Sequence, residues 1–120
     1  IRDKELGDDE LAARVETAMA IARSATSARP PLVIVNDRVH VAAQAGADGV
    51  HVGARDMPVT ETRRVLGSDV IIGRTAHSID EARQAVADGA DYLGVGPCFP
   101  STTKSFASHA SRAFLAEAAK

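Results

Sequence analysis

An eight-residue pattern occurs twice in this chain, and it limits the possible folds more than any other feature. The segment GADGVHVG spans residues 46–53, and GADYLGVG spans residues 89–96. Each copy is typical of a helix end, a tight turn and a short strand that stops at glycine. Helices that alternate with short apolar strands indicate βα units on a parallel sheet. Because the pattern repeats, the sequence predicts near-equivalent units of a (β/α)8 barrel rather than an open sheet.

Apolar runs and helix signals place the expected elements. Strands are expected at residues 32–35, 49–52, 70–73 and 92–95. One helix is expected to begin at Asp8 or Asp9 and to end before Arg29, a second covers residues 38–45, and a third begins at Pro58. Two more helices are expected, one after a capping box at residues 78–81 and one over residues 110–119. The first helix should face inward with its apolar residues at helical spacing, and in the helix after the capping box the residues expected to face inward are Ile79, Ala82 and Val86. In the first helix these residues are Leu11, Val15, Ala18, Met19 and Ala22. The strands should pair in parallel in sequence order with helices on the outer face, and those before Asn36 and Arg74 should be the most buried.

Length and composition exclude several classes of protein. A complete (β/α)8 barrel takes about 200 residues or more. The chain has 120 residues and no initiator Met, so we expect one partial barrel domain over residues 1–120 that begins inside a longer chain. The net charge of −2 argues against nucleic-acid and membrane-surface binding. The single Cys98 excludes an intramolecular disulfide. No apolar run approaches the ~20 residues of a membrane span and no signal peptide is visible, so a cytoplasmic setting is expected.

Polar residues follow each expected strand, where the site of a parallel βα protein lies. Asp37 and Asp56 follow two strands that should be neighbours, and two carboxylates at one rim can share a hard cation such as Mg²⁺. The alternative is that each aspartate caps the helix that follows it, and one oxygen can cap while the other binds a metal. If Asp37 holds the metal, Asp37→Ala should impair metal-dependent turnover with little effect on folding.

Other polar residues allow a chemical and a structural interpretation. Residues 101–104 (STTK) offer hydroxyls and an ammonium to a phosphate, although such loops are often only solvated turns. His77 could transfer protons or could be solvated at a helix start. His51 is expected to be a hydrogen-bonded interior histidine, and Arg63 and Arg64 are expected on a solvated helix face.

Taken together, these motifs resemble the thiamine-phosphate synthase family, whose members are (β/α)8-barrel transferases. The resemblance covers the chain up to about Lys104. It rests on residues 1–4 (IRDK), 35–39 (VNDRV), 46–53, 56–58 (DMP), 72–78 (IGRTAHS) and 89–104. Two departures are Thr75, where the family usually has Ser, and residues 105–108, which lack the usual acidic and Gly-rich continuation.

The resemblance implies an activity and roles for particular residues. The family joins 4-amino-2-methyl-5-(diphosphooxymethyl)pyrimidine to a thiazole phosphate, giving thiamine phosphate and pyrophosphate. The residues implied to bind the pyrimidine diphosphate are Arg2, Lys4, Asn36, Thr75 and Lys104. Those implied to meet the thiazole phosphate are Ser101, Thr102 and Thr103. Asp37 and Asp56 are implied to hold Mg²⁺, and no protein nucleophile is implied.

The resemblance also implies that this chain supplies strands two to six of eight. Small-molecule substrates are the expected partners, with self-association through sheet edges as a further expectation. Alone, the chain is expected to make thiamine phosphate inefficiently. One alternative is a thiazole tautomerase on the same barrel, in which His77 would transfer protons. Another is a non-catalytic barrel fragment that oligomerises.

Overall fold

A four-stranded parallel sheet is the centre of the computed structural model, which describes residues 1–96 and 112–118. Its strands are β1 (Ile34–Asn36), β2 (Gly49–Val52), β3 (Ile71–Ala76) and β4 (Tyr92–Val95). They pair in the order β1-β2-β3-β4, and every pairing is parallel. The predicted parallel sheet in sequence order is therefore confirmed.

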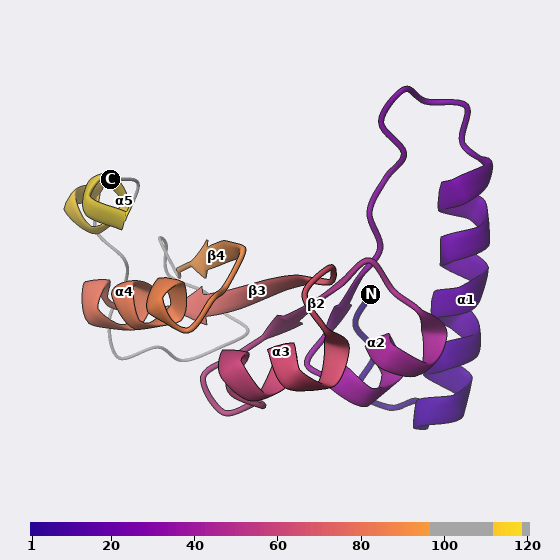
Figure 1. The fold of residues 1–120 in the computed structure, drawn as a ribbon, viewed down its shortest axis with the longest axis horizontal. Coiled ribbons are helices and arrows are strands. Elements are labelled where there is room, and N and C mark those ends of the chain that lie inside the picture. The colour runs from indigo at the N-terminus through magenta and orange to yellow at the C-terminus, as the bar shows by residue number, and fades with distance from the viewer. Residues whose placement is uncertain (97–111, 119–120) are drawn as a thin grey trace.

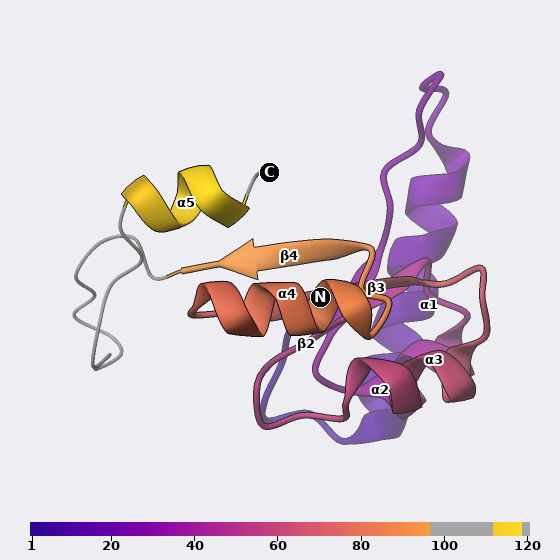
Figure 2. The same ribbon diagram turned by 60° about the vertical axis from the view of Figure 1, so that its left-hand side comes forward.

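Three helices connect the strands (Figure 1): α2 (Val39–Ala45), α3 (Val59–Leu66) and α4 (Ile79–Ala87). Helix α1 (Asp8–Ser24) precedes β1 and packs against α2. Helix α5 (Arg112–Ala118) follows β4 and contacts α4, and in the view of Figure 2 β4 runs between these two helices. No helix in the described ranges has the length and apolar character that crossing a membrane requires.

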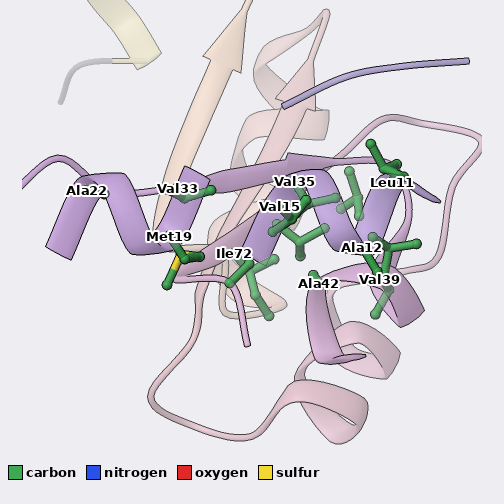
Figure 3. Packing of buried hydrophobic residues seen from close by; sticks show 14 of the residues in the cluster. Leu11, Ala12, Val15, Met19, Ala22, Val33, Val35, Val39, Ala42 and Ile72 are labelled. Carbon is green, nitrogen blue, oxygen red and sulfur yellow. The ribbon is translucent and has the colours of Figure 1, made fainter. Parts of the chain in front are cut away.

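The apolar face of α1 closes the core against the sheet (Figure 3). Leu11, Val15 and Met19 are at most 3% exposed, and they pack with Val35 of β1 and Ile72 of β3. Side chains of this size each contribute about 1.5–3 kcal/mol when fully buried. The helical spacing of apolar residues in α1 therefore predicted its inner face correctly.

The strand limits differ from the expectation at two places. The first strand begins at Ile34 because Leu32 is 61% exposed. The third strand continues to Ala76 instead of ending at Gly73, because residues 73–76 pair with the whole of β4. Strand β2 is also as buried as its neighbours, since it has a strand on each side, so the predicted ranking of burial was wrong for it.

The helix starts also differ from the expectation. Gly7 is the N-cap of α1, so Asp8 and Asp9 lie in the first turn, where their charge favours the helix dipole. Pro58 is the N-cap of α3 rather than its first residue. In α4 the inward-facing residues are Ala82 and Ala85, whereas Val86 is 61% exposed and was wrongly placed inside.

The predicted capping box at the start of α4 forms with one change. The Ser78 hydroxyl accepts the Glu81 N–H at 3.2 Å. The Glu81 carboxylate reaches one residue further back than expected and accepts the His77 N–H at 2.7 Å. Both bonds satisfy backbone donors at the beginning of the helix.

The aspartates of the repeated pattern fasten one strand to the next. Asp48 accepts the Val33 N–H at 2.7 Å, and Asp91 accepts the Ile72 N–H at the same distance. In each case the aspartate just before a strand holds the beginning of the preceding strand. The repeat is therefore a structural device that sets the spacing of parallel strands.

Arg63 strengthens the second of these contacts, so it does not lie on a solvated helix face as predicted. Its guanidinium donates to Asp91 Oδ2 at 2.7 Å and to the carbonyls of Val70 and Gly89 at 2.5 and 3.1 Å. A planar guanidinium can serve several acceptors at once, which a run of two arginines does not reveal.

Candidate active site

A cavity of about 880 Å³ opens at the carboxyl end of the sheet. Six residues singled out by the sequence line it, and they come from four separate parts of the chain: Arg2, Lys4, Asn36, Asp37, Asp56 and Thr75. The other lining residues are His51, Gly53, Ala54, Arg55 and His77. The four remaining predicted site residues, Ser101, Thr102, Thr103 and Lys104, lie outside the described residues.

The N-terminal segment is held at the rim by the first strand. The Asn36 N–H donates to the Ile1 carbonyl at 2.9 Å, and the Ile1 ammonium donates to the Ile34 carbonyl. The Asp3 carboxylate accepts the backbone N–H groups of Glu5 and Leu6, which turns the chain away from the cavity. Arg2 precedes that turn and Lys4 lies within it, and the charges of both act on Asp37.

Asp37 lies at the centre of a tight turn directly after β1. Its φ of 65° makes it the one described non-glycine residue in the left-handed region. The Arg38 N–H closes the turn onto the Asn36 carbonyl at 2.8 Å, while the Asp37 N–H still pairs with the His51 carbonyl of β2. The sheet therefore holds Asp37 in a conformation that costs an ordinary residue about 1–2 kcal/mol.

Asp56 is fixed by the loop after β2. Its carboxylate accepts the Gly53 N–H at 2.6 Å, and its own N–H donates to the Gly53 carbonyl at 3.1 Å. A side chain at Gly53 would lie only 3.0 Å from this carboxylate, so the glycine suits the close approach. The two bonds fix the Asp56 carboxylate against the loop that follows β2.

Neither aspartate caps the helix that follows it. The N-cap positions of α2 and α3 are Arg38 and Pro58, and no side chain caps either helix. Arg38 instead donates to the Leu6 carbonyl at 2.7 Å and to Asp8 at 3.0 Å. The capping interpretation of Asp37 and Asp56 is therefore wrong.

The two carboxylates influence each other. Burial raises the pKa of Asp37 above its ordinary value, and the hydrogen bond and negative charge of Asp56 raise it further. The positive charges of Arg2 and Lys4 act in the opposite direction. A pair of carboxylates that repel one another suits a divalent cation, which relieves the repulsion.

The cavity also contains Arg55 and His77, which follow strands and were expected at this rim, although no role for Arg55 was predicted from the sequence. Arg55, next to Asp56, adds a third positive charge to the lining. Within residues 1–96 and 112–118, Arg2, Lys4 and Arg55 form no hydrogen bond or ion pair, so all three are available to an anion. His77 is partly engaged, because its Nδ1 lies 3.3 Å from the Glu81 carboxylate.

His51 lies half-buried on the inner face of the sheet, and the prediction of a hydrogen-bonded histidine is confirmed. Its Nδ1 is 3.1 Å from the Tyr92 hydroxyl, and its Nε2 is 2.8 Å from Thr75 Oγ1. Burial lowers the pKa of His51, Arg74 lowers it further, and Asp37 and Asp56 oppose this. Burial also raises the pKa of Tyr92.

The comparisons with known proteins agree with this arrangement. The family model described as thiamine monophosphate synthase matches residues 1–120. The chain is 56% identical over 73 residues to the thiamine-phosphate synthase of Anaeromyxobacter dehalogenans, covering 61% of this chain and 33% of that one. It is 40% identical over 117 residues to the enzyme of that name from Rhodopirellula baltica, covering 98% and 30%.

A solved structure is similar over nearly the whole chain. Thiamine phosphate pyrophosphorylase from Pyrococcus furiosus superposes with a TM-score of 0.82 at 32% identity, covering 98% of this chain and 54% of that one. The chain spans about a third of the length of each of the two curated relatives. The similarity therefore extends over one part of longer proteins.

Proposed function

Because the chain belongs to the thiamine monophosphate synthase family, we propose that its cavity takes part in joining a pyrimidine diphosphate to a thiazole phosphate. The observation that carries this proposal is the convergence of six predicted site residues on one cavity. They are spread from Arg2 to Thr75, and only the parallel fold brings them together. Substrates of this kind are small phosphorylated molecules.

We assign the described part of the cavity to the pyrimidine diphosphate. Arg2 and Lys4 supply positive charge beside the phosphates, and Asn36 and Thr75 supply polar contacts on the inner face. Lys104 completes this set in our proposal, and Ser101, Thr102 and Thr103 bind the thiazole phosphate.

The residues present fit a magnesium ion. Asp37 and Asp56 are close enough to share a hydrogen bond, and both offer the hard oxygen ligands that Mg²⁺ prefers. Among the described residues no third His, Cys, Asp or Glu joins them. Mg²⁺ commonly binds one or two carboxylates and completes its shell with water and substrate phosphates. When bound, it would supply positive charge to the departing diphosphate.

The reaction needs charge stabilisation rather than a protein nucleophile. The bond between the pyrimidine methylene carbon and the diphosphate oxygen breaks, and its electron pair leaves with pyrophosphate. The thiazole nitrogen then gives its lone pair to that carbon to form the new C–N bond. Arg2 and Lys4 stabilise the negative charge that accumulates on the leaving group. The folded sheet holds these groups in place before the reaction begins.

We further propose that residues 1–120 form one partial domain of a (β/α)8 barrel, covering strands two to six. The segment at Ile1, which pairs with β1, then corresponds to the end of strand two, and β1 to β4 correspond to strands three to six. A cytoplasmic location and self-association through sheet edges belong to the same proposal.

The two alternative functions receive less support. A thiazole tautomerase needs His77 for proton transfer, but the His77 ring lies against Glu81 at the start of α4. A non-catalytic fragment gives no reason for two carboxylates and three unpaired cations to line one cavity. The curated relatives described above carry the name thiamine-phosphate synthase.

Pyrophosphate release tests the proposed function. The chain is incubated with both substrates and Mg²⁺, and thiamine phosphate is measured alongside. Arg2→Ala should lower kcat/KM at least tenfold, since a charged hydrogen bond contributes about 1.5–3 kcal/mol. Arg29→Ala, in the exposed connection before β1, is the matched control and should be silent. Equal rates for the two variants would contradict the proposal.

A further inference from the structure

Three side chains from three neighbouring strands form a continuous row of hydrogen bonds beside the cavity. Tyr92 of β4 reaches His51 of β2, and His51 reaches Thr75 of β3, at 3.1 and 2.8 Å. Thr75 and His51 line the cavity, whereas Tyr92 does not. The row therefore connects a residue outside the cavity lining to a hydroxyl inside it.

Two glycines make room for this row. A Cβ at Gly73 would lie 2.1 Å from the Tyr92 ring, so the ring can cross β3 only because position 73 has no side chain. A Cβ at Gly94 would lie 2.9 Å from the His51 ring. The rings of Tyr92 and His51 are 5.4 Å apart between centroids. The packing thus fixes both rings against the sheet.

We propose that Tyr92 and His51 are positioning residues that orient the Thr75 hydroxyl hydrogen toward the cavity, where it is donated to the bound pyrimidine diphosphate. This inference rests on the proposed function for the identity of the ligand. The orientation itself follows from the row of hydrogen bonds and can be tested without any ligand.

The direction of the row follows from the donors available. A neutral imidazole donates from one ring nitrogen and accepts at the other. The Tyr92 phenol is protonated at neutral pH and can donate, and within the described residues its proton has no other acceptor. If Tyr92 donates to Nδ1, the ring proton is on Nε2 and is donated to Thr75 Oγ1. The Thr75 hydrogen then remains for a ligand.

If the hydrogen bonds ran in the reverse direction, Thr75 would have no hydrogen left to donate to a ligand. Thr75 would donate to Nε2, the ring proton would be donated to the Tyr92 oxygen, and Thr75 could offer a ligand only its lone pairs. Phosphate oxygens and pyrimidine ring nitrogens are acceptors, so they would then find no donor at Thr75. The proposed direction is the one that suits such a ligand.

The tautomer of His51 is the direct test. Two-bond ¹H–¹⁵N NMR correlations on the labelled chain, near pH 8, distinguish the two neutral tautomers, and His51→Asn identifies the His51 signals among four histidines. We expect His51 to carry its proton on Nε2. Tyr92→Phe and Gly73→Ala, which respectively remove and displace the phenol, should each convert this to a mixture. A wild-type Nδ1–H tautomer, or an unchanged tautomer in both variants, would overturn the proposal.

Ligand affinity tests the consequence. In the presence of Mg²⁺, Tyr92→Phe and Thr75→Val should each raise the Kd for the pyrimidine diphosphate about three- to tenfold, and the double variant should lose little more than Thr75→Val alone. Thr75→Ser should restore binding, and Thr60→Val on the exposed side of α3 is the matched control. Additive losses would overturn the positioning role. A chain with the expected tautomer in which Arg2→Ala leaves pyrophosphate release unchanged would contradict the proposed function and leave the orientation of Thr75 intact.

Discussion

Asp37 combines a left-handed backbone with a raised pKa. Its φ of 65° is one that Gly, Asn and Asp adopt more readily than other residues, and burial and the Asp56 carboxylate raise its pKa. Because Asp37 does not cap the helix that follows it, these features support the proposal that its carboxylate serves a ligand. The positive φ is a property of the backbone that the sequence motif alone does not show.

Replacing the Asp37 carboxylate should change stability in a pH-dependent way. Because the pKa of Asp37 is raised in the folded state, its ionisation destabilises the fold as pH rises from the ordinary value of 3.8 through the raised pKa. Asp37→Asn removes this effect and tolerates the positive φ. The free energy of unfolding of Asp37→Asn, measured with urea, should therefore increase relative to that of the wild type as the pH rises from 3 to 7.

The matched variant is Asp37→Ala, which removes the same charge but not the backbone strain. It should be about 1 kcal/mol less stable than Asp37→Asn at every pH. A constant difference between Asp37→Asn and the wild type across this pH range would show that the pKa of Asp37 is not raised in the folded state.

At the scale of secondary structure, the aspartate of the second repeat should contribute measurably to the junction of β3 and β4. Asp91→Ala leaves the Ile72 N–H and the Arg63 guanidinium without their acceptor and should cost about 1–3 kcal/mol in free energy of unfolding. The backbone bond from Ile72 holds the pKa of Asp91 below its ordinary value of 3.8. This stabilisation is present above pH 3.8 and is lost as pH falls through the lower folded pKa.

Chemical denaturation at pH 7 and at pH 2 measures the contribution of Asp91. The two proteins should differ at pH 7 and approach each other at pH 2. Asp69→Ala, which removes a carboxylate bonded only to the neighbouring Ser68 hydroxyl, is the control and should change stability little. An equal loss in the two variants would mean that Asp91 does not fasten the strands.

The capping box of α4 gives a second prediction at this scale. Ser78→Ala removes the acceptor of the Glu81 N–H and should lower the free energy of unfolding by about 1 kcal/mol. Ser68→Ala, an exposed serine outside any helix start, should lower it by a few tenths at most. Thermal unfolding of the two variants compares them directly, and equal midpoints would argue against the cap.

Sequence patterns predicted the elements better than their limits. The capping box and the apolar periodicity of α1 are local signals, and both were interpreted correctly. Val86 of α4 and the end of β3 were misplaced because β4 pairs with residues 73–76 and the helix turns its alanines inward. Arg63 was misread for a similar reason, since its acceptors come from residues 67–91. Long-range pairing decided each of these cases.

For the whole molecule, the parallel topology could be predicted from the sequence. The positions of the site residues could also be predicted, but their contacts could be predicted only in part. The rule that sites lie at the carboxyl ends of parallel strands was enough to bring Arg2, Asp37, Asp56 and Thr75 together. It could not reveal that neither aspartate would cap the helix that follows it. Nor could it reveal that Tyr92 crosses a glycine to meet His51, because that contact depends on the register of three strands.

The alternation of charges around the cavity predicts that Mg²⁺ and the pyrimidine diphosphate bind cooperatively. The diphosphate alone would meet the carboxylates of Asp37 and Asp56 as well as the cations, and Mg²⁺ alone would meet Arg2 and Lys4 as well as the carboxylates. Each ligand neutralises the charge that repels the other. Each should therefore raise the other's affinity by the same factor, about 5- to 150-fold for a typical coupling.

Isothermal titration measures this coupling in both orders on the 120-residue chain. The diphosphate is titrated with and without Mg²⁺, and Mg²⁺ is titrated with and without the diphosphate; the two affinity ratios must agree. Asp56→Asn should reduce the ratio toward one while leaving some diphosphate binding to Arg2 and Lys4. The unphosphorylated pyrimidine alcohol is the control ligand and should show no dependence on Mg²⁺. Diphosphate affinity that is the same with and without Mg²⁺ would mean that Asp37 and Asp56 hold no metal against the substrate, and the site would then depend on its cations alone.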